Sequence, residues 1–424
     1  MKKLMFVVSV LLAGSAVGVP AQAAPVELPT VRVWNDLALA SVRATRASDA
    51  DAARLYAMLN AALYDALNGI TGSRTPALVA ESGPHGADAK AAAVAAVHAV
   101  LIRLDPARAA DYDAQYAADL SQLPSGRRQE AGIQWGQHVG ESVVTARADD
   151  GASPVESQPA GSGPGVFRAS WSGVQYRSVR PFAVADPAAY VPGPPPALDS
   201  LAYAAALAEV ALLGDASIPA PQELATYQFW SLPAGTVQPP GEWLRIAVEV
   251  AEARRLPLEQ ASRLTALVTM ALADTTVATV ATKFTYRHWR PTTAIREADT
   301  DGNALTQPNP AWAARAGSAG GTPEYVSGHS AYSAAAAATL AGFFCTDAIG
   351  FTHATDTAPG GQPRTYPSFS AAAAEAGRSR VYGGQHFEFS NQAGLDIGRG
   401  VATEVLATGL LRTAGPAHYG ACPR

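Results

Sequence analysis

Two cations stand seven residues apart in the stretch KFTYRHWRP, Lys283 and Arg290, in a chain where lysine is rare. In a helix, positions seven apart lie on the same face after two turns. Pro291 follows directly, and proline removes a backbone hydrogen bond from a helix interior. We therefore expect a helix that ends before Pro291 and that points Lys283 and Arg290 toward one ligand.

Two later segments add groups of complementary chemistry. Ser327-Gly328-His329 stands before an alanine-rich stretch, and SRVYGGQH places Gly383-Gly384 between Arg380 and His386. The glycines allow the chain to fold back, so that a cation and an imidazole can address one ligand. Each segment alone is also compatible with an ordinary turn. Together they offer the cations, hydroxyl and N–H donors that bind a tetrahedral oxyanion, and imidazoles that move protons near neutral pH.

The three segments, KxxxxxxRP, SGH and SRxxxGxH, resemble a known signature in their order and internal spacing. It is that of the vanadium-dependent haloperoxidase and type 2 phosphatidic acid phosphatase (PAP2) superfamily. A wider likeness to the secreted bacterial haloperoxidases runs through HWRPTTAIREADTDGN and TPEYVSGHSAYSAAAA and covers nearly all of the mature chain.

The resemblance implies a pocket for vanadate or phosphate. His386 would be the axial group, which ligates vanadium in a haloperoxidase or attacks phosphorus in a phosphatase. His329 would be the acid–base partner on the opposite side. The groups that would hold the equatorial oxygens are Lys283, Arg290, Ser327, Gly328 and Arg380.

Three positions depart from the pattern of the superfamily. Val326 stands where proline is usual, and we expect it to alter the loop little. Ser390 replaces the aspartate that usually orients the axial histidine; Glu388 or Asp396 would substitute for it, or Ser390 itself would bond to the imidazole. Thr322 replaces the His or Phe found seven residues before the acid–base histidine in algal and fungal haloperoxidases, so halide preference does not carry over.

The resemblance therefore leads first to a vanadium-dependent haloperoxidase, an oxidoreductase that uses a vanadate cofactor, hydrogen peroxide and halide. A soluble acid phosphatase is the alternative, in which His386 accepts the phosphoryl group of a phosphate ester. A non-catalytic helical binding protein with a degenerate pocket is a third hypothesis, favoured by Ser390 and opposed by the otherwise complete set of site residues.

Helical periodicity dominates the elements that must position these groups, and runs with strand-like alternation are almost absent. The fold is expected to be all-α. Six of thirteen positions match between 53–65 and 262–274, including Asp65 and Asp274, which indicates two related, packed helical bundles. Each of these aspartates is expected to meet a buried arginine or a helix N-terminus. The expected helices span 53–70, 90–104, 200–214, 243–256 and 262–284.

Composition divides the chain further. Residues 1–23 read as a signal peptide cleaved near Ala23, which predicts a secreted or periplasmic protein. A Pro/Gly/Ser-rich connection at 151–199 separates an N-terminal bundle, 24–150, from a C-terminal bundle, 200–424, that carries the site.

The numbers of charged residues, apolar stretches and cysteines limit the possible partners and the redox state of the chain. With 31 basic and 36 acidic side chains and no basic tract, nucleic acid is not an expected partner. No stretch after the signal peptide reaches the length of an uninterrupted apolar membrane span. Cys345 and Cys422 either pair or remain separate thiols.

Overall fold

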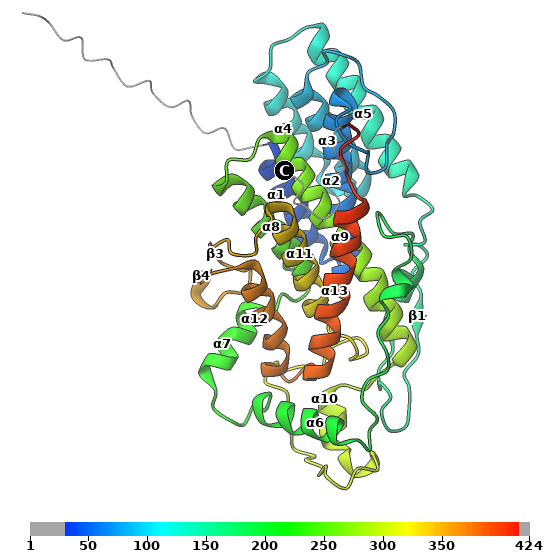
Figure 1. Ribbon diagram of the computed structural model, residues 1–424, viewed down its shortest axis with the longest axis vertical. Coiled ribbons are helices and arrows are strands. Elements are labelled where there is room, and N and C mark those ends of the chain that lie inside the picture. Colours follow the sequence, from blue (N-terminus) through cyan, green and yellow to red (C-terminus); the bar gives the residue numbers. More distant parts are fainter. Residues whose placement is uncertain (1–29, 415–424) are drawn as a thin grey trace, which may run out of the picture.

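Helices make up most of residues 30–414, the part of the chain that the computed structural model describes (Figure 1). The α-helices of the first half are α1 (Thr30–Thr45), α2 (Asp49–Thr71), α3 (Ala89–Leu104), α4 (Ala109–Ser121), α5 (Arg127–Ala146), α6 (Leu201–Leu213) and α7 (Pro221–Phe229). Those of the second half are α8 (Gln238–Ala253), α9 (Leu258–Tyr286), α10 (Pro291–Arg296), α11 (Gly328–Phe344), α12 (Phe369–Tyr382) and α13 (Glu388–Thr408). The expected all-α fold is confirmed. The expected signal peptide lies outside the described residues.

Extended backbone is limited, in this part of the chain, to two small antiparallel pairs. They are β1 (Ser157–Gln158) with β2 (Trp171–Ser172), and β3 (Phe351–His353) with β4 (Arg364–Tyr366). The stretch expected to be a connection, 151–199, contains the first pair and two 3-10 turns, Val174–Ser178 and Pro187–Tyr190, and no α-helix. The exact division into domains stays a prediction.

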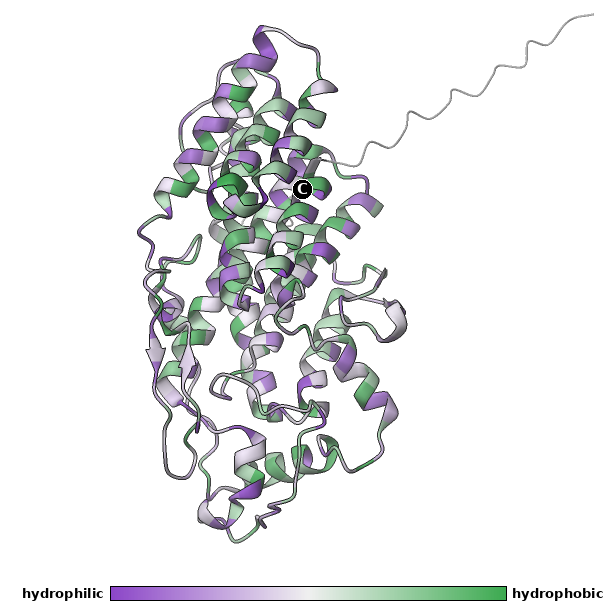
Figure 2. Cartoon of the chain, turned by 180° about the vertical axis from the view of Figure 1, so that it is seen from behind, coloured by the Kyte–Doolittle hydropathy of each residue, from purple (hydrophilic) through white to green (hydrophobic). Residues whose placement is uncertain are grey.

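The expected helices form where the apolar pattern and the capping residues agree. Ser48, Asp88, Ser200 and Ser327 each precede a helix, and each side chain accepts a hydrogen bond from a backbone N–H in its first turn. Gly72 ends α2 in the left-handed conformation, which glycine adopts without strain. Hydrophobic and hydrophilic residues alternate along the helices, as expected for helices that bury one face (Figure 2).

Helix α9 lies at the centre of the molecule and contacts α2, α8, α11 and α13 (Figure 1). By length and composition, it is the one helix within residues 30–414 that is apolar enough to cross a membrane, but 89% of its most apolar window is buried inside the protein. A core helix passes the same test. One continuous cluster of buried side chains includes residues of α2, α3, α9 and α11, so the two bundles share a core.

Two helix pairs pack with the same close backbone approach, α3 with α5 and α11 with α13. A Cβ added to Gly136 would lie 2.1 Å from the Ala92 carbonyl oxygen, and one added to Gly398 would lie 2.2 Å from that of Ala331. Only glycine allows backbones this close. The same relation occurs one turn earlier for Gly132 with Asp88 and for Gly394 with Ser327. The two bundles therefore repeat one packing arrangement, as the sequence match predicts.

The matched aspartates also have equivalent surroundings. Asp65 accepts backbone hydrogen bonds from residues 77–79, at 2.7, 2.8 and 2.8 Å. Asp274 accepts three from residues 182–184, at 2.6, 2.8 and 2.9 Å. These donors lie in loops, so the expected helix N-terminus is wrong for both. An arginine, Arg147, attracts Asp274, but more weakly than the backbone donors.

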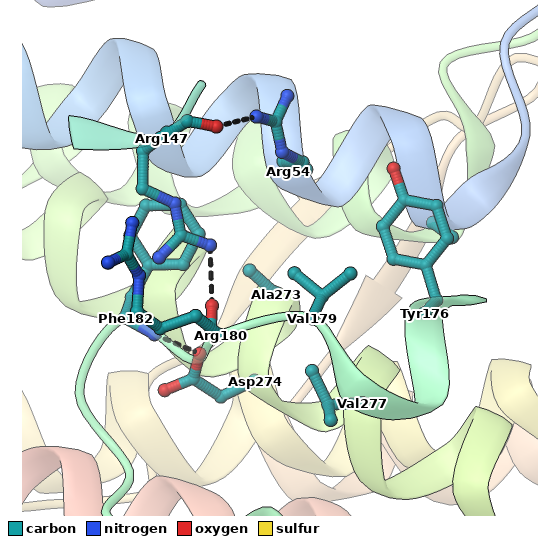
Figure 3. Close-up of a pocket in the computed structure, with 10 residues that line it drawn as sticks. Arg54, Arg147, Tyr176, Val179, Arg180, Phe182, Ala273, Asp274 and Val277 are labelled. Atoms are coloured by element: carbon teal, nitrogen blue, oxygen red, sulfur yellow. Dashed lines mark hydrogen bonds between the residues drawn. The ribbon is translucent and has the colours of Figure 1, made fainter. Parts of the chain in front are cut away.

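Figure 3 shows how the 151–199 connection is fixed beside Asp274. Arg147 donates to the Arg180 carbonyl at 2.5 Å, and its guanidinium lies 3.9 Å from the centre of the Phe182 ring. Arg54 of α2 donates to the Arg147 carbonyl at 2.6 Å. The cavity among these side chains has a volume of about 10 Å³, room for about one water molecule. The site is therefore structural: it ties the connection to both bundles.

Candidate active site

Lys283 and Arg290 reach the same pocket by a route that differs from the expected one. Helix α9 ends at Tyr286, Arg287 takes a left-handed conformation with φ of 48°, and Pro291 begins α10 instead of ending α9. The prediction that one helix face carries both cations was therefore wrong. Both still bind the segment before Ser327: Lys283 Nζ donates to the Pro323 carbonyl at 2.5 Å, and Arg290 Nε donates to the Thr322 carbonyl at 2.8 Å.

Arg290 also links this segment to the SRVYGGQH segment. Its Nη1 donates to the Gln385 carbonyl at 2.8 Å and lies 3.0 Å from His386 Nε2. The side chains of Lys283, Arg290 and Arg380 are all buried. Burial lowers the pKa of Lys283 well below its ordinary value, with a further contribution from Arg290. Burial likewise lowers the pKa of Arg290 and of Arg380 to about 10. Three desolvated cations close together favour a bound anion.

Arg380, in the last turn of α12, has unused hydrogen-bonding capacity. Its Nη2 donates to Gln385 Oε1, but Nε and Nη1 are buried and find no partner among residues 30–414. Buried guanidinium nitrogens are normally paired, so two unpaired donors on one arginine indicate a place for an acceptor. The ring of Tyr227 covers another side, with its centre 5.3 Å from the guanidinium carbon.

The N-terminus of α11 supplies further donors. Ser327 is fully buried, and its Oγ accepts a hydrogen bond from the Ser330 amide at 3.3 Å. Its Oγ also lies 2.8 Å from Ser330 Oγ, whose single proton is donated to Asn391 Oδ1 at 2.7 Å, so the Ser327 hydroxyl donates to Ser330. At Gly328, an added Cβ would meet no atom closer than 3.7 Å, so the backbone is accessible there. A helix N-terminus with free N–H groups favours negative charge.

Glu324 takes the place of the aspartate that Ser390 replaces. His386 Nδ1 lies 2.9 Å from Glu324 Oε1, which also accepts the Phe387 amide at 3.0 Å. Ser390 Oγ is farther from Nδ1, at 3.4 Å, and donates to the Glu324 carbonyl at 3.2 Å. Glu324 lies in TPEYVSGHS, three residues before Ser327, but it is not among the residues predicted from the three segments.

Glu388 and Asp396, which were predicted to replace the missing aspartate, have other partners. Glu388 bonds to Arg378 at 2.7 Å, and the exposed Asp396 bonds to Arg399 at 2.5 Å.

The carboxyl group of Glu324 is itself affected by the pocket. Burial raises the pKa of Glu324 to about 7, against the opposing attraction of Arg290.

The contacts of His386 define its tautomer. A guanidinium can only donate, so Nε2 must accept from Arg290, and the ring proton resides on Nδ1 facing Glu324. Burial lowers the pKa of His386 well below its ordinary value, and Arg290, Lys283, Arg380 and His329 lower it further. The imidazole is neutral at pH 7, with the lone pair of Nε2 directed toward the cations.

His329 is held in the complementary way. Its Nε2 lies 3.1 Å from the Ser231 carbonyl, which only accepts, so Nε2 carries the proton and Nδ1 is basic. Burial lowers the pKa of His329 well below its ordinary value, and Arg380 is the next contributor. The structure thus brings together every residue that the sequence selected, while their individual roles remain predictions.

Vanadate would fit this donor set. The unpaired Arg380 nitrogens, the accessible Gly328 backbone and the Nε2 lone pair of His386 suit an oxyanion bound through one imidazole and several hydrogen bonds. Within residues 30–414 there is no group of three or more His, Cys, Asp or Glu side chains of the kind that holds a metal cation. Cys345 is disulfide-bonded, and Cys422 lies outside the described residues.

Comparison with known proteins identifies similar sequences and folds. Residues 263–411 match the family model described as the VCPO second helical-bundle domain, and this range includes every predicted site residue. The chain is similar in structure to a bacterial vanadium-dependent iodoperoxidase, with a TM-score of 0.76 and 23% identity over 93% of this chain and 100% of that one. The chain has the vanadium haloperoxidase fold. The resemblance inferred from the three segments is confirmed at this level.

Other vanadium haloperoxidase structures are also similar. A bacterial vanadium-dependent chloroperoxidase matches in its holo form with a TM-score of 0.64 and 16% identity, over 85% of this chain and 92% of that one. Its apo form matches with a TM-score of 0.63 and 16% identity, over 84% and 92%. A comparison with curated protein sequences gave no match.

Proposed function

We propose that this chain is a vanadate-dependent haloperoxidase-type enzyme, which oxidises halide with hydrogen peroxide. The observation that carries the proposal is the presence of three buried cations around the neutral imidazole of His386, with Arg290 3.0 Å from Nε2 and two nitrogens of Arg380 left unpaired. Binding of a multiply charged oxyanion would offset the buried positive charge of this site and pair its unused donors. The fold shared with vanadium-dependent peroxidases supports vanadate as that oxyanion.

The residues divide the work of binding. Lys283, Arg290 and Arg380 would offset the charge on the oxygens, while the Ser327 hydroxyl and the Gly328 N–H would donate hydrogen bonds to them. His386 Nε2 would ligate vanadium, and Glu324 keeps the ring in the tautomer that presents a lone pair. Bound vanadate would supply a Lewis-acid centre for peroxide activation.

His329 would manage protons beside that centre. Its bond to the Ser231 carbonyl fixes the proton on Nε2 and leaves Nδ1 free to accept one. A lowered pKa keeps His329 unprotonated at neutral pH, as a base must be. Because the side chains of the pocket are buried, charge interactions within it are stronger than they would be in water.

The proposal is tested by two assays on one preparation. Apo protein is supplied with orthovanadate, and bromination or iodination of an organic acceptor by peroxide is measured beside hydrolysis of p-nitrophenyl phosphate. We expect vanadate-dependent halogenation that His386→Ala abolishes and that the matched surface variant His138→Ala retains; the His138 side chain is about half exposed.

Other outcomes have definite meanings. Phosphate release that vanadate inhibits and that His386→Ala abolishes would replace this proposal with the acid phosphatase alternative. Absence of both activities, together with no vanadate binding by calorimetry, would contradict both enzymes and leave the helical binding protein.

A further inference from the structure

A carboxylate of the first bundle reaches the pocket of the second. Asp49, the first residue of α2, is half-buried, and its Oδ2 lies 3.7 Å from the position that a Cβ on Gly328 would occupy. Oδ1 accepts the Ala50 amide at 2.9 Å. Oδ2 therefore faces the N-terminus of α11, where the expected oxyanion donors lie.

The charges around Asp49 come from three elements. Lys283 of α9 attracts it, Asp51 on the same turn of α2 repels it, and the buried phenol of Tyr332 lies nearby on α11. Burial raises the pKa of Asp49, against the attraction of Lys283. Lys283 has three N–H donors, of which one bonds to the Pro323 carbonyl and another points to that of Glu324 at 3.5 Å. Asp49 and a bound anion would thus face the same cation.

A carboxylate beside an oxyanion is repulsive unless a proton lies between them. An oxyanion that carries a hydroxyl donates that proton to the carboxylate in a short, charge-assisted hydrogen bond. A fully deprotonated oxyanion of the same shape has nothing to donate, and two like charges in one desolvated site disfavour each other strongly. Vanadate and phosphate keep a proton at neutral pH, whereas sulfate does not.

We propose that Asp49 sets the specificity of this site for protonated oxyanions, accepting the hydroxyl of vanadate or phosphate and excluding sulfate. The inference rests on the oxyanion site of the proposed function, and it adds a discriminating residue that no part of the three-segment signature contains. It also gives the first bundle a direct part in the chemistry of the second, because α2 delivers the carboxylate across the boundary between them.

Asp51 provides the matched control. It lies two residues further along α2, but its oxygens are occupied: Oδ1 accepts the Tyr176 hydroxyl at 2.6 Å and Oδ2 accepts that of Ser48 at 2.7 Å. Loss of its charge changes the same helix turn without changing the acceptor that faces Gly328.

The test is calorimetric titration of the whole apo protein with inorganic phosphate, orthovanadate and sulfate at pH 7 and constant ionic strength. In the wild type, sulfate should bind at least about tenfold more weakly than phosphate. Asp49→Asn should reduce that ratio by about tenfold or more, because an amide donates to sulfate where a carboxylate repels it. Asp51→Asn should keep the wild-type ratio.

The two proposals fail separately. Absence of phosphate and vanadate binding in the wild type would overturn the oxyanion site itself. Normal phosphate binding with the same phosphate-to-sulfate ratio in Asp49→Asn would overturn only the role of Asp49. A second neutral variant, Asp49→Ser, is titrated in parallel with circular dichroism as the check on folding, and both folded variants must move the ratio in the same direction.

Discussion

His386 and Glu324 lie 62 residues apart in the chain, yet Nδ1 of the histidine is 2.9 Å from Oε1 of the glutamate, and both side chains are buried. This pair fixes the tautomer of the residue on which the proposed chemistry depends. Because Ser390 occupies the position of the usual aspartate, the orienting carboxylate here comes from the segment before α11 instead of from α13.

Removing the charge of Glu324 should therefore weaken the site without removing it. In Glu324→Gln the ring of His386 loses its charged acceptor, and we expect orthovanadate affinity to fall by about 10–100-fold. Calorimetric titration measures the change. Glu388→Gln, which alters a surface ion pair with Arg378, should bind like the wild type. Equal affinity in both variants would show that Ser390 alone orients the ring.

Replacing Arg380 should affect stability and binding in opposite directions. In the anion-free protein its buried Nε and Nη1 are unpaired, so Arg380→Met should raise the free energy of unfolding by about 1–3 kcal/mol while it weakens phosphate binding strongly. Denaturant unfolding and titration of the same samples test both. Arg378→Met, two residues away and paired with Glu209 and Glu388, should not improve stability.

His353 should make stability depend on pH above neutrality. Burial alone would lower the pKa of His353, but its bonds to Glu242 and Glu249, both at 2.7 Å, raise it to about 8. The stabilisation is complete below the unfolded value near 6.5 and is lost as pH rises through about 8, and it amounts to about 2 kcal/mol.

The contribution of His353 to stability is measured by comparing the pH dependence of the unfolding free energy in the wild type and in His353→Gln. The decline in unfolding free energy between pH 6.5 and pH 9 should be smaller by about that amount in His353→Gln than in the wild type. Parallel curves for the two proteins would mean that His353 is not charged in the folded state.

The glycine contacts predict matched destabilisation in the two bundles. Gly136→Ala and Gly398→Ala each force a Cβ to within 2.1–2.2 Å of a carbonyl oxygen, and each should cost about 1–3 kcal/mol by thermal or denaturant unfolding. Gly193→Ala, which meets no atom within 4 Å, should be close to neutral. Only the change at Gly398 should also weaken phosphate binding, because it displaces α11. A neutral Gly398→Ala would show that the helices separate at little cost.

The sequence was sufficient for the helices and for the membership of the site. Apolar periodicity and local caps such as Ser48 and Ser327 depend on neighbouring residues, and the three segments keep fixed internal spacings. The sequence was not sufficient to predict turns of the backbone between elements, such as the turn at Arg287. Nothing in the pattern indicates that Arg287 adopts a positive φ, a conformation uncommon outside glycine, and this turn removes Arg290 from α9.

Glu324 and Asp49 were missed for a related reason. Each acts on a residue far away in the chain, His386 for one and the Gly328 region for the other, so no local spacing connects them. Their partners depend on how α11 and α13 pack and on where α2 begins, which is a property of the assembled core.

Helices α3 and α11 begin alike and differ in the residue that caps them. Asp88 caps α3, its Oδ1 accepting the Ala91 amide at 2.9 Å, whereas the neutral Ser327 caps α11. In the first bundle the positive end of the α3 dipole is thus offset by a carboxylate of the chain itself, the side chain of Asp88. In the second the cap carries no charge, and the carboxylate that faces Gly328, Asp49, belongs to α2, so an anion from solution can supply further counter-charge at this helix end. Under the proposed function, an exchangeable anion in place of a built-in carboxylate distinguishes the bundle that carries the oxyanion site from the bundle that supports it.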